Sequence, residues 1–92
     1  MVDADACVST VSSSGTPTIQ IYNVSQTVDM LSTRITIDAN EKTSWTAATP
    51  PVIDGANNLV YTGEELRIDV DVAGTGAKGL TVILVFAQFV PA

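Results

Sequence analysis

The chain has 92 residues, enough for one small domain. Hydrophobic residues make up 46% of it and charged residues only 15%, so polar surface for an isolated domain is scarce, which favours a partner. The formal net charge is −6 with four basic residues, which excludes the basic footprint of nucleic-acid binding and disfavours an anionic membrane surface.

Residues 1–15 are expected to form an extended N-terminal arm, followed by a single domain over residues 16–92. Small side chains, a run of serines and a closing glycine are typical of an extended or flexible segment. Val2, Val8 and Val11 give it apolar content, so it can dock on a partner as an extended peptide. A disordered tail fits the composition equally well. The segment lacks a basic region followed by an apolar run, so no secretory signal is expected.

The next segments predict short strands joined by turns. In Pro17–Val24 and Met30–Ile37, apolar and polar side chains alternate with the period of two that is typical of strands. The composition of Asp38–Lys42 predicts a turn, and Thr43–Ala48 is a candidate short strand whose tryptophan is expected in the core. Residues 49–65 combine turn residues with short apolar pairs, and a helical turn or a short strand would both fit.

The most informative stretch covers residues 63–86. In Leu66–Val72, four aliphatic side chains alternate strictly with Arg67, Asp69 and Asp71, which predicts a strand with one dry and one wet face. A glycine-rich loop follows, and then Leu80–Phe86, which is apolar at nearly every position. A strand of this kind is covered on both faces, either by its own domain or by a neighbouring chain.

These patterns predict an all-β fold, a small β-sandwich or jelly-roll-like domain. Short strand candidates and turn signals recur along the chain, and no segment has the composition of a long helix. A small β-domain has a thin stability margin, so it needs a well-packed second sheet or a partner.

No group of side chains points to catalysis. The chain has no histidine, and Cys7 is its only cysteine, so a disulfide within the chain and a site of several cysteines are excluded. Asp69 and Asp71 lie on the predicted wet face beside Arg67, which favours a solvated surface over a catalytic carboxylate pair. We therefore expect a non-enzymatic protein with no cofactor and no metal.

Two further motifs have structural explanations. Asp38, Asn40 and Glu41 offer oxygen ligands for Ca²⁺, but their spacing does not match an EF-hand loop, so a turn is favoured. The run Gly74–Gly79 superficially suggests a phosphate loop. Its lysine is followed by glycine and a strand, not by Ser or Thr and a helix, so a connection between strands is favoured.

Two motifs carry a resemblance to a known class of domain. They are IDANE at Ile37–Glu41 and IDVD at Ile68–Asp71, the latter followed by a loop that ends in GTGAKGL. With the segments around them, Thr16–Phe86 resembles a small domain found in structural proteins of tailed bacteriophages. The resemblance implies a β-rich module that decorates a capsid or forms part of a tail, neck or fibre, and it supplies no catalytic motif.

The first functional hypothesis is a virion structural protein, namely a capsid decoration (cement) or head-fibre protein acting as a homo-oligomer. It would be made in the host cytoplasm, and its partners would be capsid or tail components, with no nucleic acid and no membrane. The candidate assembly contacts are the apolar residues of the arm and the C-terminus: Val2, Val8, Val11, Phe86, Phe89 and Val90.

The alternative hypothesis is a receptor- or glycan-binding module of a tail or neck fibre. Aromatic faces suit glycans as well as protein interfaces. The exposure of the tryptophan separates the two hypotheses, because a binding platform must be accessible and a core residue is not. The candidate patch consists of Tyr22, Trp45, Asn57, Asn58 and Tyr61.

Overall fold

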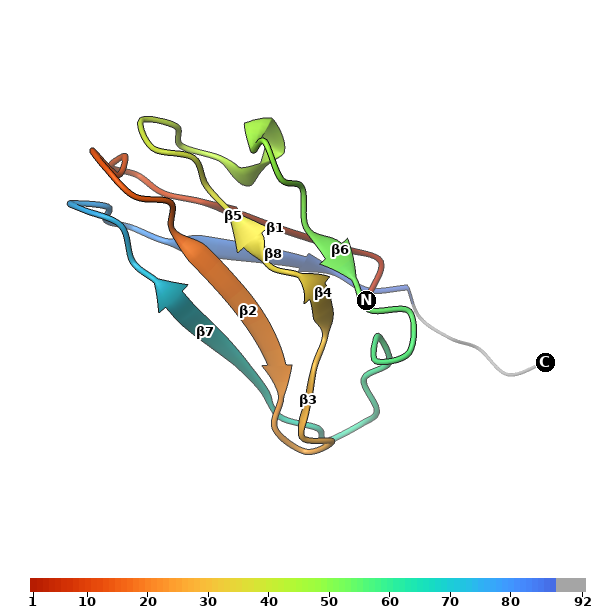
Figure 1. The fold of residues 1–92 in the computed structure, drawn as a ribbon. Coiled ribbons are helices and arrows are strands. Elements are labelled where there is room, and N and C mark those ends of the chain that lie inside the picture. Colours follow the sequence, from red (N-terminus) through yellow and green to blue (C-terminus); the bar gives the residue numbers. More distant parts are fainter. Residues whose placement is uncertain (88–92) are drawn as a thin grey trace.

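The computed structural model describes residues 1–87, and in them the chain is all-β with antiparallel sheets, as predicted (Figure 1). The one helical element in this part of the chain is the 3-10 turn η1 (Ser44–Thr46), and no helix there is long and apolar enough to cross a membrane. The strands are β1 (Asp3–Cys7), β2 (Thr18–Asn23), β3 (Val28–Asp29), β4 (Leu31–Thr33), β5 (Ile35–Thr36), β6 (Val52–Ile53), β7 (Leu66–Val72) and β8 (Thr81–Val85).

Within residues 1–87 the strands form three antiparallel sheets. β1 and β8 form a two-stranded ladder that runs from Asp3↔Val85 to Cys7↔Thr81. β2 is the centre of the largest sheet, with β3 and β5 on one edge and β7 on the other. β4 turns away from that sheet and pairs with β6. In Figure 1, β8 passes behind the start of β2, and β1 passes behind β5.

The hydrophobic core joins the β1–β8 ladder to the sheet around β2. Ile19 and Ile21 of β2 and Ile35 of β5 are completely buried. Ala4 and Ala6 of β1 belong to the same buried cluster, where their small side chains permit a close approach of the two layers. The largest fully buried aliphatic side chains all come from residues 19–37, whereas β7 and β8 contribute only partly buried ones.

The N-terminal segment corrects the prediction of a separate arm over residues 1–15. Asp3–Cys7 is a strand of the domain, and Met1, Ala4, Ala6 and Val8 are buried in its core. The sequence DADAC does alternate with a period of two, but its inward side chains are alanines, which give a weak hydropathy signal. Residues 1–8 are therefore part of the domain and not a separate arm.

The predicted strand Met30–Ile37 is split into β4 and β5, and the side chain of Gln20 fills the gap in the sheet. Its Oε1 accepts hydrogen bonds from the backbone N–H groups of Ile21 (3.0 Å) and Leu31 (3.1 Å), and its Nε2 donates to the carbonyl of Leu31 (3.0 Å). A side-chain amide thus replaces a rung of the ladder where the backbone of β4 departs from β2.

The segment Thr43–Ala48 contains the turn η1 in place of the predicted strand, and Trp45 lies outside the core with 76% of its surface exposed. The inward residue is its neighbour Ser44. The Ser44 hydroxyl accepts a hydrogen bond from Ala6 N (3.0 Å) and donates to Asp5 Oδ1 (3.2 Å). Anchoring of Ser44 to β1 leaves the tryptophan directed to solvent.

The serine run and the glycine-rich loop lie side by side at one end of the molecule (Figure 1). Thr10 and Lys78 each donate a backbone hydrogen bond to the carbonyl of the other (3.1 and 3.2 Å). Thr75 N donates both to Ser14 O and to Ser12 Oγ, each at 3.0 Å. The connection predicted for Gly74–Gly79 is thus an ordered loop that joins β7 to β8.

Candidate interaction surfaces

The outward face of the β1–β8 ladder carries an apolar row beside an acidic row. Ile83 and Val85 of β8 are 48% and 45% exposed, while the alternating side chains of the strand pack against the core. Asp5 and Asp3 lie opposite them in the register. This face complements an apolar surface that carries basic groups. Leu80–Phe86 is therefore covered by its own domain on one face only.

The same ladder ends in two exposed apolar residues from opposite ends of the sequence. Val2 N donates a hydrogen bond to Val85 O (2.7 Å), next to the last pair of the ladder, Asp3↔Val85. Val2 and Phe86 lie directly beside this pair in the chain, and their exposed fractions are 58% and 45%. We call Ile83 and Val85, the aliphatic residues on the outward face of β8, the β8 patch.

The inward-facing aliphatic side chains of β7 are more exposed than the alternation in the sequence predicts. Ile68 and Val70 share a face with the buried Ile21 and Ile19 of β2, yet about half of each β7 side chain is exposed (49% and 50%). The ladder of β1 and β8 meets the β2 sheet next to β5, on the side of β2 away from β7. Beside the row, an apolar cavity of about 170 Å³ opens between Val70, Ile19 and Leu80.

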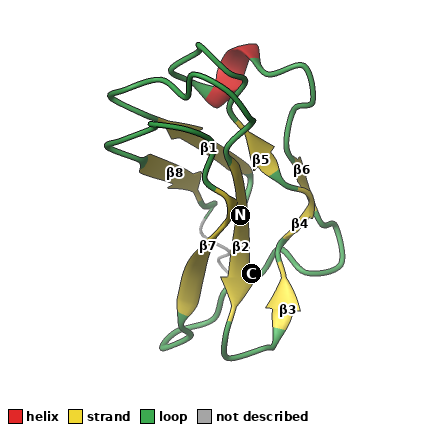
Figure 2. Ribbon diagram, turned by 60° about the vertical axis from the view of Figure 1, so that its left-hand side comes forward, coloured by secondary structure: helices red, strands yellow, loops and turns green. Residues whose placement is uncertain are grey.

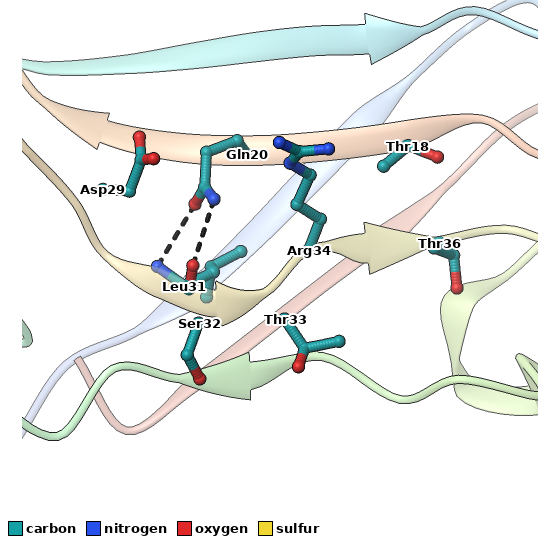
Figure 3. Close-up of a pocket in the computed structure, with 8 residues that line it drawn as sticks. All are labelled: Thr18, Gln20, Asp29, Leu31, Ser32, Thr33, Arg34 and Thr36. Atoms are coloured by element: carbon teal, nitrogen blue, oxygen red, sulfur yellow. Dashed lines mark hydrogen bonds between the residues drawn. The ribbon is translucent and has the colours of Figure 1, made fainter.

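A polar groove of about 380 Å³ lies where β4 leaves β2, lined by residues of β2 to β5 (Figure 3). Three of its four hydroxyl groups donate to backbone carbonyl groups. Thr18 Oγ1 donates to Thr16 O and Thr36 Oγ1 to Thr49 O, both at 3.0 Å. The polar atoms of the groove therefore serve mainly to hold the surrounding loops.

Ion pairs occupy the outer face of the β2 sheet. Arg34 reaches across β2 to Asp71 on β7 (3.1 Å), and Arg67 forms a two-pronged pair with Asp69 (2.6 and 3.0 Å). The Arg67 guanidinium also lies 4.6 Å from the centre of the Tyr22 ring. Its hydrogen bond holds the pKa of Asp69 below the ordinary value, so this carboxylate is fixed as an anion.

The structure separates the predicted assembly contacts. Val2 and Phe86 are exposed, and each adjoins a residue of the last pair of the β1–β8 ladder. Val8 is buried, with 6% of its surface exposed, so its role as a surface contact is corrected; Val11 is half-buried. Phe89 and Val90 lie outside the described residues.

The alternative patch is not a single surface. Trp45 and Tyr61 are exposed, whereas Tyr22, Asn57 and Asn58 are half-buried. Tyr22 sits at the β3 end of β2, and Trp45 belongs to η1 at the opposite end of the molecule (Figure 2). A ligand the size of one sugar ring cannot contact both.

The acidic turn has a structural role within the described residues. Asp38 Oδ2 accepts a hydrogen bond from Ala48 N (2.9 Å), and Glu41 Oε2 accepts one from Thr46 Oγ1 (2.6 Å). Residues 1–87 contain no group of three or more His, Cys, Asp or Glu side chains placed to hold a metal ion.

The exposed aliphatic rows of β7 and β8 were not among the predicted site residues. The sequence did contain a signal for them, because a chain of 92 residues with 46% hydrophobic residues is too small to bury all of their side chains. No protein-family model matches the chain, and comparisons with curated proteins and with solved structures found no match.

Proposed function

We propose that this protein is a non-enzymatic structural module of a virion, a capsid decoration (cement) or head-fibre protein of a tailed bacteriophage. The observation that supports this role is the β8 patch. A small domain that keeps aliphatic side chains half-exposed on a regular strand face is suited to bury them against a larger surface. The resemblance of Thr16–Phe86 to phage structural domains points to the same class.

The attachment face is the outer side of the β1–β8 ladder. Its aliphatic row supplies the hydrophobic contact, and Asp3 and Asp5 beside it select a partner with basic groups at the rim of the interface. In this proposal the domain is a small open sandwich, with the β1–β8 ladder as the layer that meets the particle. Attachment thus comes from a strand face and not from an N-terminal arm.

Co-sedimentation with capsids that lack this protein tests the proposal. We expect Ile83→Asp to lower the affinity about ten- to a hundredfold, because burial of one aliphatic side chain is worth about 1.5–3 kcal/mol. Leu59→Asp is the matched control, since Leu59 is a loop residue with a similar exposed fraction of 54%. Equal binding by the two variants, or no binding by the wild-type protein, would contradict attachment through this face.

The exposure of Trp45 favours a second candidate, a receptor- or glycan-binding module. An indole ring with 76% of its surface exposed is an available stacking platform. Trp45→Ala belongs in the same experiment, because it leaves the β8 patch intact. Unchanged capsid binding by this variant, combined with quenching of wild-type tryptophan fluorescence by host glycans, would assign Trp45 to a separate binding role.

A further inference from the structure

We infer that a second copy of this chain pairs with the free edge of β7, antiparallel and about a two-fold axis at Ile68. β7 pairs with β2 on one side, and within the described residues no strand covers its other side. An uncovered edge of seven residues presents a row of N–H and C=O groups, which form a template for another strand. The inference refines the proposed assembly role by specifying how copies meet.

The backbone hydrogen bonds show which residues of β7 face the open edge. Val24 N donates to Glu65 O (2.9 Å), whereas Ile21 O accepts from Met30 N on the far side of β2. In an antiparallel ladder this direction alternates along each strand. Arg67 and Asp69 therefore turn their peptide groups toward β2, and Leu66, Ile68 and Val70 turn theirs to the open edge.

The alternation of side chains and of backbone groups along β7 determines which registers two copies can adopt. The aliphatic row of one β7 must continue the aliphatic row of the other, because a slip of one residue would place apolar side chains on the wet face. With Ile68 on the axis, Ile68 lies opposite Ile68 of the second copy and Leu66 opposite Val70. The half-exposed row of each copy is then extended by the row of its neighbour.

Charge selects this register among those that keep the faces matched. With the axis at Ile68, Arg67 of each copy lies opposite Asp69 of the other, so two arginines and two aspartates form a neutral group on the outer face. A shift of the axis by one residue would set Arg67 opposite Arg67 or Asp69 opposite Asp69, and a shift to Val70 would set Asp69 opposite Asp71. Like charges directly opposite destabilise a pair of strands. The Arg67–Asp69 pair within one chain already holds both groups on the outer face of the sheet.

Charge reversal tests both the interface and its register. We expect wild-type protein to sediment as a dimer, and Arg67→Asp and Asp69→Arg to sediment as monomers when each is alone. An equimolar mixture of the two variants should restore a heterodimer, since the two carboxylates of the first variant would then face the two guanidinium groups of the second across the axis. Lys42→Asp is the matched control, because it changes the net charge as Arg67→Asp does but lies in the loop before η1.

Each outcome bears on the inference. Restoration by mixing also shows that both variants are folded. A wild-type monomer throughout a dilution series would overturn the pairing, and so would dimers of both single variants or a mixture that remains monomeric. The proposed function is tested separately. A monomer that still binds capsids through Ile83 would support the proposed function while overturning the pairing. A dimer that does not bind capsids would overturn the proposed function while leaving the pairing in place.

Discussion

At the scale of single residues, Glu64 connects two segments that are far apart in the sequence. Its Oε1 accepts hydrogen bonds from Tyr61 N (2.7 Å), from Gln26 Nε2 (2.7 Å) and from the buried Asn23 (3.4 Å). The hydrogen bond from Tyr61 N–H is the main cause that lowers the pKa of Glu64 below its ordinary value, and the two amides act in the same direction. The loop before β7 is therefore held to the β2–β3 turn by an ionised carboxylate.

Acid should weaken this link. Because the folded-state pKa is the lower one, the contribution of Glu64 to stability is fully present above the unfolded-state pKa of about 4.3 and is lost as the pH falls through the folded-state value. We expect Glu64→Gln to flatten the decrease of the unfolding free energy below about pH 5. Urea unfolding at several pH values measures this.

Glu65→Gln provides the control for the acid experiment. Glu65 is the exposed neighbour of Glu64, and its carboxylate accepts no hydrogen bond among the described residues. Its replacement should leave the pH profile unchanged. Identical profiles for wild-type protein and both variants would show that Glu64 makes no difference to stability in acid. Asp69, whose pKa is also lowered, accounts for part of the remaining slope.

At the scale of elements, the split between β4 and β5 depends on one buried amide. Gln20→Leu has a similar size but removes the acceptor for two N–H groups and the donor to Leu31 O. An unsatisfied buried polar group costs about 1–3 kcal/mol, so we expect the variant to lose at least that much stability. Hydrogen exchange at the Leu31 amide should rise at the same time.

Gln26→Leu is the matched comparison for Gln20→Leu. Gln26 also donates through its side-chain amide, to Leu59 O (3.1 Å) and to Glu64, but it lies nearer the surface, where water can replace the lost partners. We expect a smaller loss of stability and no change in exchange at Leu31. Equal losses for the two glutamine variants would rule out a special role for the bridge.

The strands that could be predicted are those whose own sequence carries a strong alternation or an apolar run. Leu66–Val72 has the predicted bounds, and β2 and β8 fall inside Pro17–Val24 and Leu80–Phe86. The predictions failed where residues that are distant in the sequence determine the local structure. Ser44 turns Trp45 outward by bonding to β1, and Gln20 interrupts a strand that its own sequence favours. Likewise, the pairing of β1 with β8 joins segments distant in the sequence, which local patterns do not reveal.

At the scale of the whole molecule, β1 is an integral part of the core, and this is testable. Ala6→Asp would bury a carboxylate at a position that is 2% exposed, and an unpaired buried charge costs several kcal/mol out of a typical total of about 5–15. We expect this variant to be unfolded by circular dichroism. Val2→Asp is the same kind of change at an exposed position of the same segment and should fold. Normal folding of both variants would restore the interpretation of residues 1–15 as an arm.

The pairing of the first strand with the last also sets the order of events during folding. Asp3↔Val85 joins residues from nearly opposite ends of the described chain, so the entropy of closing a long loop is lost before this ladder gives any stabilisation. During synthesis, Ala4 and Ala6 emerge from the ribosome long before the residues of β8 that complete their layer. The β2–β5 segment, which carries the largest buried side chains, can collapse first, but the nascent domain remains open until the last strand arrives.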